Sequence, residues 1–309
     1  MDRRLPPVDV TFQARTLARG GKVAVLWKKT MLAILSVILV LAVVLLYGDI
    51  QWDSGTRELR RRLETSKTTM EIQSFDGHNL AALPAPVQRY FRAVLREGQP
   101  IVAAVDVSQT GSMDLGQTPQ RWKSFTATQR VVTRRPGFDW DARVSVMPGL
   151  PVYVHDTYIA GEGILHAAVV GIVPLANFRG TGEIAQGELM RFLAEAAWYP
   201  TALLPSQGVR WDAVDDRSAR ATLMDGSVSV TILFGFNEEG LIDTGRVEAR
   251  GRLVGDKLVP TPWLGHYWNY VLRDGMRVPL DAEVAWGLPE GVKPYWRGHI
   301  TRVTYEFAR

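Results

Sequence analysis

The sequence predicts an α+β protein: an N-terminal transmembrane helix, followed by a curved antiparallel β-sheet or open barrel that wraps one or two amphipathic helices. Three observations lead to this prediction: an uncharged apolar run at residues 31–47, helical periodicity in residues 84–98 and 187–204, and many short alternating segments elsewhere. Apolar residues spaced three and four apart are typical of a helix with one buried face, and strict alternation is typical of a half-buried strand.

The apolar run Met31–Tyr47 directly follows Lys28 and Lys29. Residues 30–48, at roughly 1.5 Å per residue, are long enough for a hydrocarbon core of about 30 Å. The lysines abut the run, whereas the next basic residue beyond it is Arg57. We therefore expect a single-pass protein of the bacterial inner (plasma) membrane, with a cytoplasmic N-terminus and an extracytoplasmic large domain. A cleaved signal peptide is the alternative, but no A-x-A-like site follows the run.

The net charge of +4 is concentrated at the N-terminus, because residues 1–29 hold seven of the 36 Lys and Arg residues against two acidic ones. Such a tail suits anionic lipid headgroups. No basic patch with interleaved aromatics follows, so we expect no nucleic-acid partner. The absence of cysteine excludes disulfides, thiolate metal ligands and a cysteine nucleophile.

These features divide the chain into four expected parts. Residues 56–67 are polar all round except at Leu59 and Leu63, which predicts a solvated helical spacer; headgroup binding by residues 60–62 is the alternative. The parts are a basic cytoplasmic tail without regular structure (1–29), a transmembrane helix (30–48), a juxtamembrane helical linker (49–76) and an extracytoplasmic β-rich domain (77–309).

The β-rich domain contains two amphipathic helical patterns between many strand-like segments. Residues 228–236 illustrate the strands, because apolar and polar side chains alternate there after a turn at 224–227. Hairpin-linked strands of this kind predict a curved antiparallel sheet. We expect the helix over residues 187–204 to fill the concave face and the helix over 84–98 to close it.

Charged residues at helical spacing give one candidate site. Glu188, Arg191 and Glu195 share a face, where two carboxylates are suited to acid–base chemistry and the guanidinium to an anionic substrate. A solvated ladder of ion pairs is the simpler interpretation, and we favour it.

Other motifs indicate no cofactor or metal. Residues 180–185 match G-x-G-x-x-A, but a dinucleotide site also needs a parallel βαβ unit, so we interpret the glycines as a turn. His155 lies beside Asp156 in a strand-like run, and the remaining histidines are scattered without metal-ligand spacing. We interpret them as isolated histidines.

Aromatic residues gather in the last fifty positions, which predicts either core packing or an aromatic-lined pocket. In the second case Arg297 or Arg191 would meet the polar head of a lipid or hydrophobic ligand.

Three segments resemble an uncharacterised bacterial family, a domain of unknown function usually tethered to the membrane by an N-terminal helix. They are LPAPVQRYFRAVL, then GELMRFLAEAAWYPTALLP followed by GVRW, then TPWLGHYWNY…GMRVPLDAEVAWGLPEGVKPYWRGHI. The resemblance covers roughly residues 80–307. By architecture it is similar to the lipoprotein-carrier half-barrels of the bacterial envelope, in which a curved sheet surrounds an acyl chain. This step rests on fold analogy. The positions that the family pattern implies are Glu188, Trp198, Trp263, Tyr270, Glu283, Trp286, Tyr295, Trp296 and Arg297.

The expected function is that of a membrane-anchored envelope protein that binds an apolar or lipid-like ligand in a half-barrel pocket. The expected partner is a membrane lipid or a hydrophobic small molecule, with no cofactor. The alternatives are an envelope enzyme that uses Glu188 or Glu283, with Arg191 as electrostatic partner, and a structural or assembly module. A hollow space between the sheet and the helix at 187–199 would favour carriage, and a filled one a scaffold. The expected ligand-binding residues are Glu188, Arg191, Trp198, Trp263, Tyr270, Glu283, Trp286, Tyr295, Trp296 and Arg297.

Overall fold

The computed structural model describes residues 10–69, 74–115, 120–255 and 257–308, with backbone alone for 10–26. The chain divides into two compact units, Met1–Ile50 and Gln51–Arg309. The first helix, α1 (Val10–Thr65), contributes to both. It begins inside the tail that we expected to be irregular, of which residues 1–9 lie outside the described residues. Its segment Trp27–Thr65 contains a stretch long and apolar enough to cross a membrane, judged by length and composition.

In the part of the chain that the structure describes, thirteen strands form one sheet in the order β6-β5-β4-β3-β2-β1-β13-β12-β11-β10-β9-β8-β7. Every pair of neighbours is antiparallel. The first six strands are β1 (Val102–Asp114), β2 (Trp122–Val132), β3 (Gly137–Met147), β4 (Leu150–Ile159), β5 (Glu162–Val169) and β6 (Val173–Gly180). The other seven are β7 (Arg210–Asp215), β8 (Ser218–Asp225), β9 (Val228–Phe236), β10 (Ile242–Val254), β11 (Lys257–Arg273), β12 (Met276–Leu288) and β13 (Gly291–Phe307).

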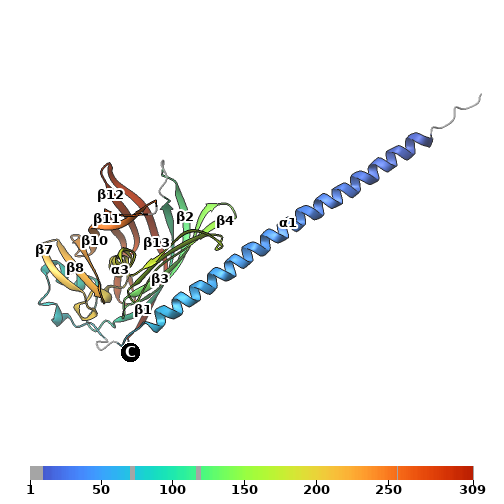
Figure 1. Cartoon of the computed structure of the whole chain (residues 1–309). Helices are drawn as coiled ribbons and strands as arrows, with labels where there is room; N and C mark the ends of the chain where they lie inside the picture. The colour runs from blue at the N-terminus through green and yellow to red at the C-terminus, as the bar shows by residue number, and fades with distance from the viewer. Residues whose placement is uncertain (1–9, 70–73, 116–119, 256, 309) are drawn as a thin grey trace, which may run out of the picture. The chain divides into compact units, whose positions relative to one another are not determined.

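The strand order places one helix inside the curved sheet. Each half of the sheet is a meander of consecutive hairpins, and pairing of β1 with β13 joins the halves. Strands β6 and β7 are therefore the two outer edges, although they are consecutive along the chain. The connection between them is α3 (Glu183–Glu195), followed by three short 3₁₀ turns at Ala196–Trp198, Pro200–Leu203 and Pro205–Gln207. It crosses the concave face and contacts strands of both halves (Figure 1). This arrangement confirms the predicted fold class.

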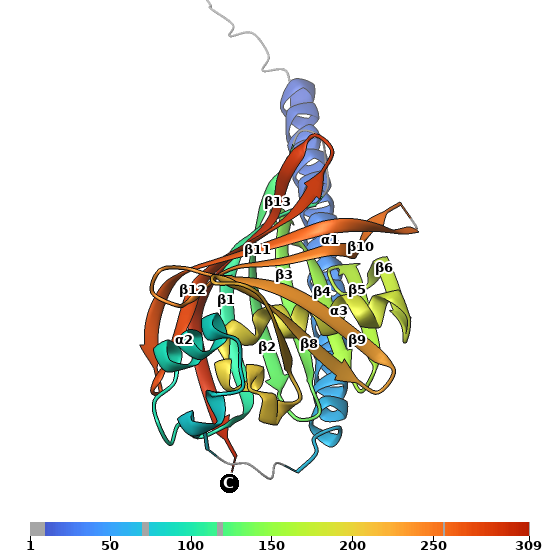
Figure 2. The same cartoon turned by 90° about the vertical axis from the view of Figure 1, so that its left-hand side faces the viewer.

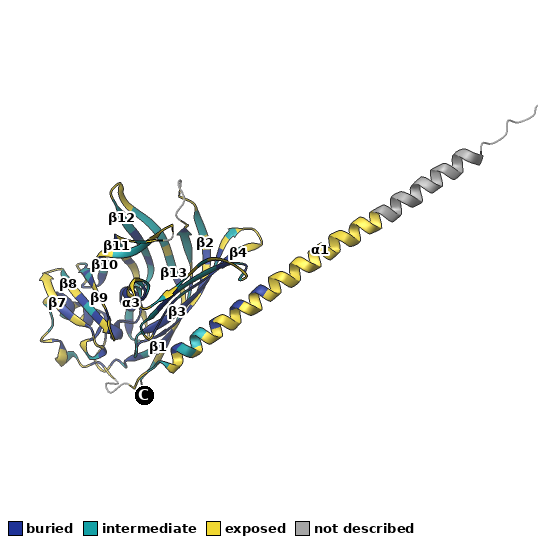
Figure 3. Cartoon of the chain, viewed as in Figure 1, coloured by how far each residue is buried: buried dark blue, intermediate teal, exposed yellow. Residues whose placement is uncertain are grey.

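The concave face holds the main hydrophobic core. Leu189, Phe192 and Leu193 of α3 are fully or almost fully buried against the sheet. The second helix, α2 (Ala85–Val94), buries one face that includes Tyr90 and packs on β12 and β8 (Figure 2). Buried positions thus gather around α3, as the dark blue residues show (Figure 3). The apolar stripe of α3 therefore packs against the sheet.

The convex face is covered by residues 51–65 of α1, so the expectation of a solvated spacer is wrong there. Trp52 and Leu63 are buried, and Leu63 packs on Ala104, Val132 and Ile159. The polar positions of this helix misled the sequence analysis because many of them bond to side chains of the sheet. The expected boundaries of the linker and domain stay predictions.

Candidate functional site

The charged face of α3 is buried, so the favoured interpretation as a solvated ion-pair ladder is wrong. Glu188 and Glu195 are 5% and 8% exposed. Arg191 Nε donates to Glu195 Oε1 at 2.7 Å, and Arg191 Nη1 donates to Asp156 Oδ2. Its guanidinium also lies 4.8 Å from the ring centre of Trp140. Burial opposes its charge, but Glu195 and Asp156 outweigh that effect and raise the pKa of Arg191.

The carboxylates beside Arg191 are only partly satisfied by partners within the protein. Glu195 Oε2 accepts from Gln129 Nε2 at 2.6 Å. Glu188 Oε2 and Asp156 Oδ1 are both buried and lack a donor among the described residues. Burial raises the pKa of Glu188 well above its ordinary value, and Asp156 raises it further. Two adjacent buried carboxyl groups cannot both ionise cheaply, so the raised pKa of Glu188 favours its protonated form beside Asp156.

An aromatic cavity of about 110 Å³ lies beside this charged cluster. Its walls come from α3, the turn that follows, and strands of both halves of the sheet. They consist mainly of apolar and aromatic side chains, with a few charged ones. The cavity is lined by Met113, Trp140, Asp156, Arg191, Ala194, Glu195, Trp198, Arg250, Trp263, Tyr267, Ala282, Val284, Tyr295 and Trp296.

An irregularity in β13 gives the cavity two consecutive aromatic side chains. The register with β12 shifts between Val284, which pairs with Trp296, and Ala285, which pairs with Pro294. The extra residue is Tyr295, so the usual alternation of faces breaks and both Tyr295 and Trp296 line the cavity. Other aromatic rings pack against these two side chains. The ring centres of Trp286 and Tyr295 lie 5.0 Å apart, and those of Phe125 and Trp296 lie 5.7 Å apart.

Three hydrogen-bond donors of the cavity are left without a strong acceptor in the part of the chain that is described. Trp198 is 2% exposed, and its indole N–H has no partner. Arg250 makes no ion pair within 4.0 Å; it reaches only the Tyr295 hydroxyl oxygen, at 3.4 Å, and lies 5.5 Å from the ring centre of Trp263. That hydroxyl also accepts from Trp263 Nε1 at 3.0 Å, which leaves its own proton to donate.

Two more hollows follow α3 away from the aromatic cavity. One of about 260 Å³ shares Arg250 with it, and one of about 400 Å³ shares Gln186, Met190 and Ala249 with the second. The space around α3 is thus packed on the side of its apolar stripe and open along the side of β9 and β10. Neither of the two extremes that we expected, hollow or filled, describes it.

The structure brings together some of the ten residues expected to bind ligand. Arg191, Trp198, Trp263, Tyr295 and Trp296 line the aromatic cavity. Of the other five, Glu188 borders the charged cluster and Trp286 supports the Tyr295 ring.

The remaining three lie elsewhere. Tyr270 donates to the carbonyl oxygen of Ile242 at 2.6 Å. Glu283 accepts from Arg297 Nε at 2.6 Å. Because Ala282 and Val284 line the cavity, strand alternation places Glu283 on the opposite, convex face. Their roles in binding stay predictions.

Sequence reasoning did not select Arg250, Asp156, Trp140 or Met113, which also line the cavity. Arg250 belongs to residues 246–252, where charged side chains alternate with small or apolar ones, and this pattern does not distinguish it from Arg246 or Arg252. Asp156 was noticed only as the neighbour of His155. The positions of Arg250 and Asp156 in the cavity wall depend on which strands pair, and no local sequence pattern predicts that pairing.

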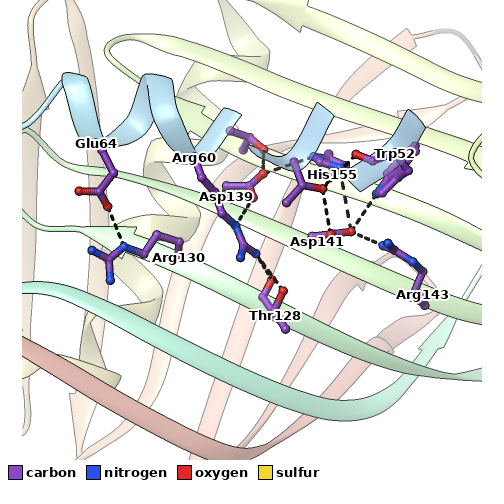
Figure 4. Close-up of polar contacts among 11 residues, drawn as sticks. Trp52, Arg60, Glu64, Thr128, Arg130, Asp139, Asp141, Arg143 and His155 are labelled. Atoms are coloured by element: carbon purple, nitrogen blue, oxygen red, sulfur yellow. Dashed lines mark hydrogen bonds and ion pairs between the residues drawn. The ribbon is translucent and has the colours of Figure 1, made fainter. Parts of the chain in front are cut away.

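A second polar cluster lies on the convex face under α1 (Figure 4). Asp141 accepts from Trp52 Nε1 at 2.9 Å and from Thr56 Oγ1 at 3.0 Å. His155 Nε2 lies 3.0 Å from the same Thr56 oxygen, and its Nδ1 lies 3.4 Å from Asp139 Oδ1. His155 is therefore buried among polar partners, and its interpretation as an isolated histidine is wrong.

Arginines extend this convex cluster. Arg60 Nε donates to Asp139 Oδ2 at 3.0 Å, and Arg130 donates to Glu64 at 2.8 Å. Arg62 donates to Glu162 at 2.6 Å, and Arg61 pairs with Glu58 within the helix. The arginines at 60–62, which we considered for headgroup binding, thus all have protein partners. No group of three metal-ligating side chains occurs among residues 10–69, 74–115, 120–255 and 257–308.

Comparison with known proteins identifies a family without an activity. The model of the family of unknown function DUF6920 matches residues 81–305. This confirms the resemblance to an uncharacterised family. No curated protein matches the chain.

Solved structures give three distant likenesses. A DUF1329 family protein from Desulfovibrio piger ATCC 29098 is 9% identical, with a TM-score of 0.36 over 66% of this chain and 86% of that one. A LolA superfamily protein from Nitrosomonas europaea is 14% identical, with a TM-score of 0.31 over 73% and 94%. A beta-barrel-like protein of domain of unknown function DUF1849 from Brucella abortus is 10% identical, with a TM-score of 0.22 over 67% and 99%. We base no functional statement on these likenesses.

Proposed function

For this chain, which belongs to the DUF6920 family of unknown function, we propose that the concave face binds an apolar or lipid-like ligand in the cavity beside α3. The observation that supports this most is the aromatic cavity with buried, unpartnered donors. An empty apolar cavity forfeits the contacts that its lining would make in a packed core. Small-molecule sites typically combine such walls with a few polar groups that fix orientation.

The size of the cavity restricts how a ligand sits. A volume of about 110 Å³ is too small for a whole lipid. A longer ligand would continue along α3 into the hollow of about 260 Å³, which shares Arg250 with the cavity. From there it would reach the hollow of about 400 Å³, which shares Met190 with that hollow. In this proposal the groove between α3 and β10 takes the rest of the ligand.

We also propose that the N-terminal helix anchors the protein in the bacterial inner membrane, with the large unit on the extracytoplasmic side. The support is the uncharged run at 31–47 and the lysine pair before it. An anchored binding domain meets amphiphiles that leave or enter the bilayer nearby.

The proposal is tested with a neutral apolar probe that reports contact. Bromine quenches tryptophan fluorescence at short range, and Trp140, Trp198, Trp263 and Trp296 line the cavity. We expect saturable quenching of the full chain in detergent micelles by a medium-chain bromoalkanol. Ala282→Phe should abolish the saturable component, because the added ring fills the cavity next to Tyr267, which lies opposite Ala282 on β11.

Ala213→Phe is the matched control, since Ala213 is exposed on β7. Val284→Phe is a second blocking variant at a less buried wall position, in case Ala282→Phe does not fold. Equal saturable quenching of the wild-type protein and of folded blocking variants would contradict the proposal.

A further inference from the structure

We infer that the ligand of the aromatic cavity carries an anionic head group that is bound by Arg250, with Tyr295 and Trp198 as further donors. This inference rests on the proposed function, because it names the chemistry of the same site. It follows from which hydrogen-bonding groups around the cavity are satisfied within the protein and which are not.

Most acceptors around the cavity already have donors within the protein. Glu195 accepts from Arg191 through one oxygen and from Gln129 through the other. Asp156 accepts from Arg191 through Oδ2, and its Oδ1 is buried without a donor among the described residues. Arg191 is in turn enclosed by two carboxylates and two aromatic rings, Phe138 and Trp140. A cationic head group at Glu195 or at Asp156 Oδ2 would have to displace one of these partners.

The donors are not occupied. A half-buried guanidinium with no carboxylate within 4.0 Å in the described part of the chain is unusual beside a charged cluster, because charges withdrawn from water are normally paired. Arg250 instead lies over Trp263 and touches a hydroxyl group at 3.4 Å. The buried N–H of Trp198 has no acceptor at all among the described residues. An unpartnered buried donor destabilises the empty protein, and a ligand acceptor removes that penalty.

The position of Arg250 orients the ligand. It lines both the aromatic cavity and the adjoining hollow along α3, so it stands where the two meet. Its planar guanidinium suits the two oxygens of a carboxylate or phosphate. The apolar part of the ligand then contacts rings such as Trp263 and Trp296. The inferred ligand class is an anionic amphiphile.

Three brominated probes of equal chain length test this inference with the full chain in neutral detergent micelles at pH 7: an alkanoic acid, an alkanol and an alkylamine. We expect the acid to bind roughly 10- to 100-fold more tightly than the alkanol, because one charge-assisted hydrogen bond contributes a binding free energy of that size. Arg250→Gln should remove this preference and leave the affinity for the alkanol unchanged. Arg252→Gln is the control, because it makes the same change on the same strand away from the cavity lining.

A second variant guards against misfolding. Trp198→Phe removes only the indole N–H and ring edge. We expect it to lower the affinity for the acid several-fold, while quenching of Trp263 and Trp296 still reports binding. Competition with an alkyl phosphate distinguishes a phosphate head group from a carboxylate head group. If an equal concentration of alkyl phosphate displaces the acid, the site accepts a phosphate head group; if it does not, the site is specific for a carboxylate.

The two proposals fail in different ways. Equal binding of acid and alkanol, tighter binding of the amine, or a preference that survives Arg250→Gln would overturn the anionic head group alone. Saturable binding of none of the probes would overturn the binding function as well.

Discussion

Strands β3 and β4 bury charged groups on both faces, but the two faces treat them differently. On the convex face, Asp139 and Asp141 accept hydrogen bonds from α1, and the helix covers them. On the concave face, Arg191 pairs with Asp156 and Glu195, while the indole N–H of Trp198 at the cavity beside them has no acceptor among the described residues. Buried charge by itself therefore does not mark a binding site. The proposed site rests instead on an unpartnered donor beside a cavity.

The two faces should also respond to acid in opposite directions. On the concave face, burial and Asp156 raise the pKa of Glu188, so its contribution to stability is present below about pH 4.5 and is lost as pH rises through the raised value. On the convex face, burial and His155 lower the pKa of His166. Its contribution is present above about pH 6.5 and is lost as pH falls through the lowered value.

The largest effect should follow from breaking the concave cluster at its centre. Arg191→Leu leaves Glu195 and Asp156 buried without their cation, and we expect it to lower the free energy of unfolding by about 3–5 kcal/mol. Chemical denaturation of the full chain in micelles measures this. Arg217→Leu, which breaks an exposed pair with Glu238, is the control and should change little. A loss no greater than that of the control would contradict a buried cluster.

Leu63→Ala tests whether the end of α1 belongs to the folded unit. Leu63 is fully buried on the convex face, so its truncation should lower the free energy of unfolding by about 2–5 kcal/mol. Leu272→Ala makes the same change at a side chain that is 66% exposed and should stay within about 0.5 kcal/mol. If the two variants unfold alike, the segment behaves as the solvated spacer that the sequence predicts.

Glu188→Gln tests the raised pKa of Glu188 on the concave face. Glutamine resembles the protonated acid, so the variant should match the wild-type protein near pH 4 and exceed its stability increasingly toward pH 8. The difference should reach on the order of 1 kcal/mol or more, because each unit of pKa shift contributes about that much. Denaturation curves across this pH range measure it. A difference that shrinks as pH rises would mean that Glu188 is ionised in the folded protein.

His166→Gln gives the smallest expected effect, on the convex face. The His166 ring stacks on Trp52 at 5.1 Å, and protonation there is disfavoured in the folded state. We expect the wild-type protein to lose stability between pH 7 and pH 5 relative to the variant, by less than about 1 kcal/mol because solvent screens the half-exposed ring. The same pH dependence in both proteins would show that another group controls the response.

The fold was predictable because it follows from local patterns. Alternation along residues 228–236 and the helical spacing from Leu189 to Ala197 each report a buried face, and hairpin-linked strands leave few architectures. The site was only partly predictable. Trp263, Tyr295 and Trp296 stood out as aromatic residues, but the bulge that turns both Tyr295 and Trp296 inward is a matter of register.

The least predictable features join distant parts of the chain. Arg191 meets Asp156 because α3 crosses from one edge strand to the other, and this route is decided by strand order. The spacer prediction was wrong for a related reason. A helix with arginines at residues 57 and 60–62 is expected to be solvated, unless carboxylates such as Asp139 and Glu162 lie opposite on a sheet formed about a hundred residues later.

The central claim is that the cavity beside α3 holds an amphiphile. It is tested most directly by native mass spectrometry of the full chain, extracted from its membrane in a mild detergent, with the wild-type protein compared to Ala282→Phe and Ala213→Phe. We predict that the wild-type protein and Ala213→Phe carry a bound anionic amphiphile in a one-to-one complex and that folded Ala282→Phe carries none. Equal retention by all three proteins, or a bare mass for the wild-type protein, would contradict it.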